Sequence, residues 1–204
     1  MKRTGSVIIA VFVFLLGFSC FGLAAGPNIL TMSCNQEFGT IDPQRGNDWT
    51  ESMAMVNVYD ALVFPNSAGD MEPKLATSWV ATPDGLTYTF TLRKGVRFHD
   101  GSEVTAEDVA FSMNRAIALK EGYSWLWADV VDKVTAKGNT VTFRLNKPFA
   151  PFLSTLAWLF VANKDLILAH KEAGDSPEFG DYGAKWLSVT TNEDAGSFNP
   201  KFCI

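Results

Sequence analysis

The stretch from Leu75 to Arg115 constrains the fold most, because several local signals follow one another in it without interruption. Apolar residues alternate with threonines from Leu86 to Leu92, and a period of two is typical of a strand with one buried face. Asp84-Gly85 predicts a turn before this strand, since glycine tolerates positive φ and aspartate bonds to its own backbone. A second turn is predicted at Asp100-Gly101.

A helix follows this turn. Thr105 is the predicted N-cap, and Glu107 and Asp108 lie where the helix dipole favours negative charge. Four apolar residues then recur at the spacing of a single helix face: Val109, Met113, Ala116 and Ile117. Gly122 suits the C-terminal cap. The block therefore reads as strand, turn, short strand and capped helix, which indicates a mixed α/β chain.

The same signals predict the remaining elements. They are a strand at 29–34, a helix at 50–62 capped by Thr50, a polar turn at 66–70, a hairpin at 131–145 turning at 137–139, a short helix starting at Pro151, a buried strand at 159–161, and a helix at 165–173 that stops near Gly174.

The first residues predict a secretory signal peptide at 1–24. Lys2 and Arg3 precede an apolar run, and Gly22-Leu23-Ala24 supplies small residues for cleavage. Cys20 leaves lipid attachment open, although Phe18 stands where a small residue is expected. The formal net charge is −5 and becomes more negative without this segment, which argues against binding to nucleic acid.

The string from LATSW to SMNR resembles the extracytoplasmic solute-binding proteins, family 5, which serve the dipeptide, oligopeptide and nickel class of ABC importers. The resemblance extends from about Ile29 to about Gly196 and includes Ile41-Asp42-Pro43, Tyr59-Asp60-Ala61-Leu62 and Gly180-Asp181-Tyr182-Gly183. It implies a periplasmic-binding-protein-like fold of type II with an inserted subdomain. It also implies a function: capturing a peptide or related small solute and delivering it to the permease subunits.

By this resemblance, 25–196 is the N-terminal part of lobe I, with the inserted subdomain at about 46–157. The sequence departs from the family at 197–204, which predicts a truncated chain without a second lobe. Such a chain is expected to be marginally stable, with apolar residues exposed where the missing part would pack. The candidates for exposure are Phe149, Phe152, Leu153, Leu156, Trp158, Leu159 and Phe160.

Two loops match the family positions that reach the ligand. The predicted ligand-binding residues are Asn47, Asp48 and Trp49 in one loop and Tyr123, Trp125 and Trp127 in the other. Aromatic rings there would pack on a peptide side chain or a sugar, and backbone amides near Asn47 and Asp48 would bond an extended ligand. The alternative is that the three aromatic residues of the second loop belong to the core.

Other residue types give weaker signals. Asp42 is interpreted as a turn or cap residue and His99 as a surface residue at a strand end, with no second metal ligand near it in the sequence. No catalytic motif occurs, so we predict neither an enzyme nor a cofactor. A nonfunctional remnant, a ligand-presenting receptor for a membrane sensor, and an oligosaccharide or nickel receptor stay open, as does pairing of Cys34 with Cys203.

Overall fold

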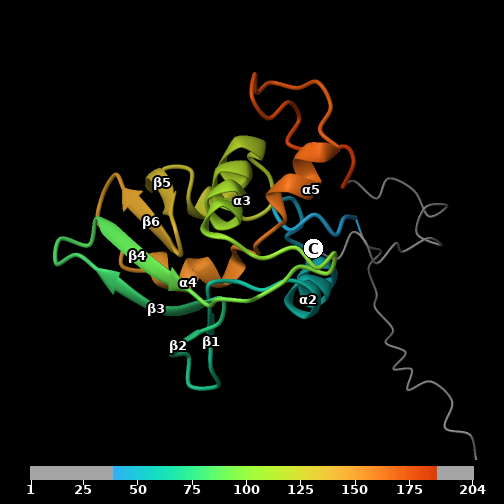
Figure 1. The fold of residues 1–204 in the computed structure, drawn as a ribbon. Helices are drawn as coiled ribbons and strands as arrows, with labels where there is room; N and C mark the ends of the chain where they lie inside the picture. Colours follow the sequence, from blue (N-terminus) through green and yellow to red (C-terminus); the bar gives the residue numbers. More distant parts are fainter. Residues whose placement is uncertain (1–38, 188–204) are drawn as a thin grey trace, which may run out of the picture. The chain divides into compact units, whose positions relative to one another are not determined.

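Residues 39–187, the part of the chain that this computed structural model describes, contain a four-stranded antiparallel sheet (Figure 1). The spatial order of its strands is β3 (Ala76–Ala81), β4 (Thr87–Leu92), β6 (Thr140–Leu145) and β5 (Val131–Lys137). Two short strands, β1 (Val63–Pro65) and β2 (Met71–Pro73), form a separate ribbon around the predicted turn at 66–70.

The predicted alternation in β4 is confirmed. Phe90 is fully buried on the inner face of the sheet, where its ring meets Phe143 of β6 edge-on with centroids 5.6 Å apart. On the opposite face, Thr89 and Thr142 pair through their hydroxyls at 3.1 Å. One face is thus apolar and packed while the other is polar, the arrangement expected of an antiparallel sheet covered on one side.

The helix α3 (Ala106–Leu119) begins as predicted, with Thr105 as N-cap, and packs on β5 and β6. Val109 and Met113 of the predicted stripe are fully buried. The predicted C-cap is wrong, because Lys120 takes the left-handed conformation and its N–H donates to Ala116. Gly122 has a different role: a Cβ there would lie only 2.7 Å from the carbonyl oxygen of Gln44.

Helix α2 (Trp49–Val58) differs from its prediction at both ends. Its N-cap is Asp48 rather than Thr50, and the backbone of Tyr59 is already extended. Beyond it, Asp60 accepts from Val161 N and the Leu62 carbonyl accepts from the Lys74 and Ala76 N–H groups. These long-range bonds replace the helical ones, so the helix stops four residues early.

The second half of the described chain contains the predicted hairpin of β5 and β6 and the predicted short helix, α4 (Phe152–Thr155), after Pro151. Two 3₁₀ turns, η2 (Ser124–Leu126) and η3 (Leu156–Trp158), were not predicted. Residues 159–161 are buried but form no strand. Helix α5 (Lys164–Ala169) ends at Ala169, short of the predicted stop near Gly174.

The predicted exposure of apolar residues in 149–160 is wrong for the described chain. Phe152, Leu156, Leu159 and Phe160 are buried, and Phe149, Leu153 and Trp158 are half-buried against the same core. Phe152 packs against the sheet, where its ring lies 4.8 Å from that of Tyr88 and 5.6 Å from that of Phe143.

Several predictions concern residues outside 39–187. They are the signal peptide at 1–24, the lipid site at Cys20, the strand at 29–34, the divergent tail at 197–204 and the cysteines at 34 and 203. Within the described residues, no helix combines the length and apolar character needed to cross a membrane.

A fully buried ion pair joins the start of the described chain to α3. Arg115 donates from Nη1 to Asp42 Oδ1 at 2.5 Å and from Nη2 to Oδ2 at 2.6 Å. Nη1 also reaches Gln44 Oε1 at 2.8 Å, and Nε donates to the carbonyl of Tyr182 at 2.8 Å. The Gln44 amide in turn donates to the Phe160 carbonyl at 2.7 Å. The Arg115 guanidinium therefore ties α3 to the segment 42–44 and to Tyr182, and Gln44 extends this network to Phe160.

We expect Asp42→Asn to lower the free energy of unfolding by about 3–5 kcal/mol, because it leaves the buried Arg115 charge without its counter-ion. The control is Asp132→Asn, which breaks the exposed pair with Arg144 and is expected to cost less than about 1 kcal/mol. Urea unfolding of both variants measures the difference. Equal losses would contradict a special role for the buried pair.

Candidate ligand-binding surface

The first predicted ligand loop is held from behind by Glu51 of α2. The Glu51 carboxylate is 5% exposed and accepts three backbone N–H groups, from Thr40 at 3.0 Å, Asn47 at 2.9 Å and Asp48 at 3.1 Å. The side chains of Asn47, Asp48 and Trp49 are exposed, and Trp49 is 74% exposed. The loop thus turns its backbone toward the protein and its side chains toward solvent.

This geometry corrects one sequence-based expectation. The amides of Asn47 and Asp48 were expected to bond an extended ligand, but both already donate to Glu51. The carbonyl of Asn47 accepts the Tyr123 hydroxyl at 3.5 Å. A ligand at this loop therefore meets side chains rather than free N–H groups.

The second predicted loop divides between surface and core. Trp125 is 69% exposed, whereas Trp127 is 2% exposed and its indole N–H donates to Thr155 Oγ1 at 3.0 Å. Tyr123 is half-buried, with its ring stacked on Trp158 at a centroid distance of 4.9 Å. Of the three aromatic residues, the structure thus places Trp127 in the core, the alternative that the sequence left open.

Contacts join the two loops directly. The Tyr123 hydroxyl lies 2.9 Å from Ser52 Oγ on α2. Gly122 lies close to the backbone of Gln44, and the preceding residue, Glu121, forms an ion pair with Arg45 at 2.8 Å. The structure therefore brings 45–52 and 121–125 into contact, which sequence order alone does not require.

The resulting surface, hereafter the Trp49/Trp125 surface, consists of Asn47, Asp48, Trp49, Tyr123 and Trp125. Its two tryptophans are among the few large apolar side chains that are exposed in residues 39–187. Such rings offer a large flat area with a polar edge and lose little conformational entropy on contact. The surface suits packing against a small organic ligand.

Sequence reasoning missed two residues that shape this surface. Glu51 stands three residues after Asp48, the spacing of a capping box, and this signal was readable had Asp48 rather than Thr50 been taken as the cap. Ser52, which holds Tyr123, gave no signal, since its partner is distant in sequence.

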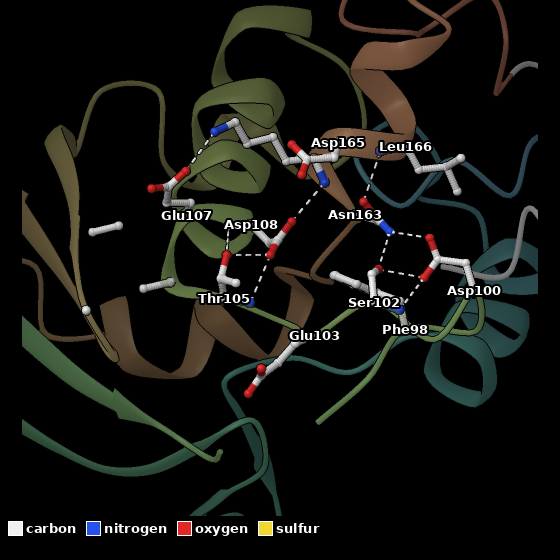
Figure 2. Close-up of a pocket in the computed structure, with 14 residues that line it drawn as sticks. Phe98, Asp100, Ser102, Glu103, Thr105, Glu107, Asp108, Asn163, Asp165 and Leu166 are labelled. Carbon is white, nitrogen blue, oxygen red and sulfur yellow. Dashed lines mark hydrogen bonds and ion pairs between the residues drawn. The ribbon is translucent and has the colours of Figure 1, made fainter. Parts of the chain in front are cut away.

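A concave region lies at the N-terminus of α3, with a volume of about 510 Å³ (Figure 2). Its polar groups are largely bound to one another. Asn163 donates to Asp100 at 3.0 Å and to Ser102 at 2.9 Å, as Figure 2 shows. Asp108 accepts from the backbone N–H groups of Thr105 at 2.8 Å and Lys164 at 2.9 Å. These bonds fasten the start of α5 to the loop before α3.

Charges in this region are tuned by local hydrogen bonds. The hydroxyl of Ser102 is the main cause that lowers the pKa of Asp100, helped by the Ser102 N–H and the Asn163 amide. Glu107 and Lys164 bond at 2.8 Å, and this bond lowers the pKa of Glu107 and raises that of Lys164. All three groups are held in their charged forms, as structural partners require.

Within residues 39–187, no three His, Cys, Asp or Glu side chains lie close enough together to hold a metal ion. His99, predicted as a surface residue, is exposed in the turn before Asp100.

The comparisons with known proteins bear on the family of the chain. Residues 70–186 match the profile of a family described as "Bacterial extracellular solute-binding proteins, family 5 Middle". This match covers more than half of the chain. The chain belongs to this family.

Individual relatives agree with the family. A probable D,D-dipeptide-binding periplasmic protein of Escherichia coli is 33% identical over 167 residues, covering 77% of this chain and 32% of the relative. Heme-binding protein A of Haemophilus influenzae is 39% identical over 127 residues, covering 52% and 23%. The chain thus spans a third or less of the length of these relatives.

A solved structure also resembles the chain in fold. It is the ABC transporter-associated periplasmic binding protein DppA of Helicobacter pylori in complex with the peptide STSA. The two share 34% identity and a TM-score of 0.55 over 62% of this chain and 29% of that one. The periplasmic-binding-protein-like fold class predicted from the sequence is confirmed.

Because Trp127 lies in the core and Trp125 at the surface, replacing them should change the free energy of unfolding by very different amounts. Trp127→Ala removes a buried ring and leaves the Thr155 hydroxyl without its donor, so we expect a loss of about 3–5 kcal/mol in unfolding free energy. Trp125→Ala is expected to change it by no more than about 0.5 kcal/mol. Chemical unfolding followed by circular dichroism measures both, and a large loss for Trp125→Ala would place that ring in the core.

The lowered pKa of Asp100 predicts a pH dependence. Because its folded-state pKa lies below the ordinary value of 3.8, the ionised carboxylate stabilises the fold above that pH, and this contribution is lost as the pH falls through the folded-state value. Asp100→Asn should therefore flatten the acid limb of a plot of stability against pH relative to the parent chain. Parallel acid limbs for the Asp100 variant and the parent would contradict the assignment.

Proposed function

We propose that this chain acts in solute capture outside the cytoplasmic membrane, as the substrate-binding component of an ABC importer, with peptides as the ligand class. The observation that carries the proposal is the Trp49/Trp125 surface: two exposed indoles on loops joined by Tyr123, in a member of solute-binding family 5. An exposed tryptophan ring offers a ligand a large apolar area at a low cost in conformational entropy.

Peptides are the preferred ligand because of the relatives. One is described as D,D-dipeptide-binding, and one solved structure holds the peptide STSA. A heme-binding relative argues that the family fold also accepts other solutes. An oligosaccharide or a nickel complex is therefore the alternative ligand, and presentation to a membrane sensor the alternative role.

The geometry suggests how a peptide would be held. Trp49 and Trp125 would pack on its side chains, while the exposed Asn47 and Asp48 side chains would bond its polar groups. Backbone pairing is not part of the proposal, because Glu51 occupies the N–H groups of the loop. Trp127 is also left out, since it is buried.

We further propose that the described residues belong to the first of two lobes, as the family resemblance implies, and that a second lobe would close over the same surface. The inserted subdomain would span about 46–157. In that arrangement the closed form presents itself to the permease subunits.

The test measures binding of the tetrapeptide Ser-Thr-Ser-Ala and of D-alanyl-D-alanine to the 204-residue chain by isothermal titration calorimetry. We expect Trp49→Ala and Trp125→Ala each to weaken peptide binding roughly tenfold, a change of about 1.4 kcal/mol. Val80→Ala is the control, because Val80 is similarly exposed at 71% but lies on β3. Hemin serves as the non-peptide probe.

Three outcomes would count against the proposal. They are a loss of affinity in Val80→Ala equal to that in the tryptophan variants, binding of hemin but of neither peptide, and no binding of any probe by a folded chain.

A further inference from the structure

We propose that Glu51 is a positioning residue for the Trp49/Trp125 surface, an inference that rests on the proposed function and names the group that fixes its shape. Glu51 does not face the solute. Its carboxylate is 5% exposed and points back into the loop that precedes α2. It acts through the backbone of Asn47 and Asp48, whose side chains reach the surface.

The loop is built around this carboxylate. A Cβ at Gly39 would lie 2.7 Å from Glu51 Oε1, and one at Gly46 would lie 2.9 Å from Oε2 and 2.2 Å from the Met55 methyl. Only glycine fits at such approaches without a shift of the loop or of Glu51. The chain therefore passes the carboxylate closely on both sides before it enters the helix.

Within residues 39–187, the hydrogen bonds to the Glu51 carboxylate come only from neutral donors. They are the N–H groups of Thr40, Asn47 and Asp48, and the N-terminus of α2 adds its favourable dipole. A glutamine has the same shape but only one acceptor oxygen. Its NH₂ group would face an N–H group of the loop, so donor would meet donor and the loop would move.

The effect of Glu51 extends to the second loop. Ser52, the next residue of α2, holds the Tyr123 hydroxyl at 2.9 Å, and Tyr123 stands two residues before Trp125. A change in how the chain enters α2 is thus passed to both tryptophans.

Helix α3 offers a matched control. Asp108 occupies the same third position after its N-cap, is 6% exposed and accepts from Thr105 N at 2.8 Å, Thr105 Oγ1 at 2.6 Å and Lys164 N at 2.9 Å. Its loop carries none of the proposed ligand residues. Asp108→Asn therefore imitates the loss of a buried capping carboxylate without touching the Trp49/Trp125 surface.

The experiment compares Glu51→Gln with Asp108→Asn in the 204-residue chain. Urea unfolding establishes that each variant is folded, and calorimetry with Ser-Thr-Ser-Ala measures affinity. Iodide quenching in a Trp125→Phe background, corrected with the Trp49→Phe, Trp125→Phe double variant, reports on Trp49 without any ligand. We expect both variants to lose stability, but only Glu51→Gln to weaken binding roughly tenfold and to change the quenching of Trp49.

The two readouts separate the two proposals. If the parent chain binds neither peptide, the proposed function fails, and the quenching of Trp49 still decides whether Glu51 positions it. Unchanged quenching in a folded Glu51→Gln variant overturns the inference. An equal effect of Asp108→Asn on affinity or quenching also overturns it, because the change would then follow from lost stability alone.

Discussion

The ion pair between Asp42 and Arg115 is the contact on which the arrangement of the described chain depends. A buried guanidinium needs all its donors satisfied, and here a carboxylate and an amide from one segment and a main-chain carbonyl from another satisfy it. The residues joined are 67 to 73 positions apart in sequence. By fixing Asp42 against α3, the pair sets where the chain starts its approach to Glu51 and the candidate ligand loop.

The same physical device recurs on a smaller scale at the two main helices. Each begins with a buried carboxylate at its third position, Glu51 in α2 and Asp108 in α3, and each carboxylate binds backbone groups outside its own helix. Around Asp108 the result is a fastening between α3 and α5. Around Glu51 the result is a loop whose side chains face solvent. The carboxylate of Asp108 therefore makes a structural contact, whereas that of Glu51 lies behind a candidate ligand surface.

Sequence patterns predicted a helix or strand correctly where its signal comes from residues close together in the chain. The alternation in β4, the Thr105 cap and the hairpin of β5 and β6 depend on neighbours within a few residues. Predictions failed where distant partners compete: α2 stops early because Asp60 and Leu62 bond to remote strands and loops. Phe152 was expected at an open face, yet it packs against Tyr88, a partner 64 positions away that no period reveals.

The sequence by itself determined the family, the strand and helix periods, and the two loops in which candidate ligand residues were sought. Only the tertiary structure decided which of their side chains face solvent. Trp125 and Trp127 lie two residues apart and are chemically identical, but one turn of 3₁₀ helix directs one indole outward and the other to Thr155 in the core. Burial depends on the packing of distant segments, and that information is not contained in local spacing.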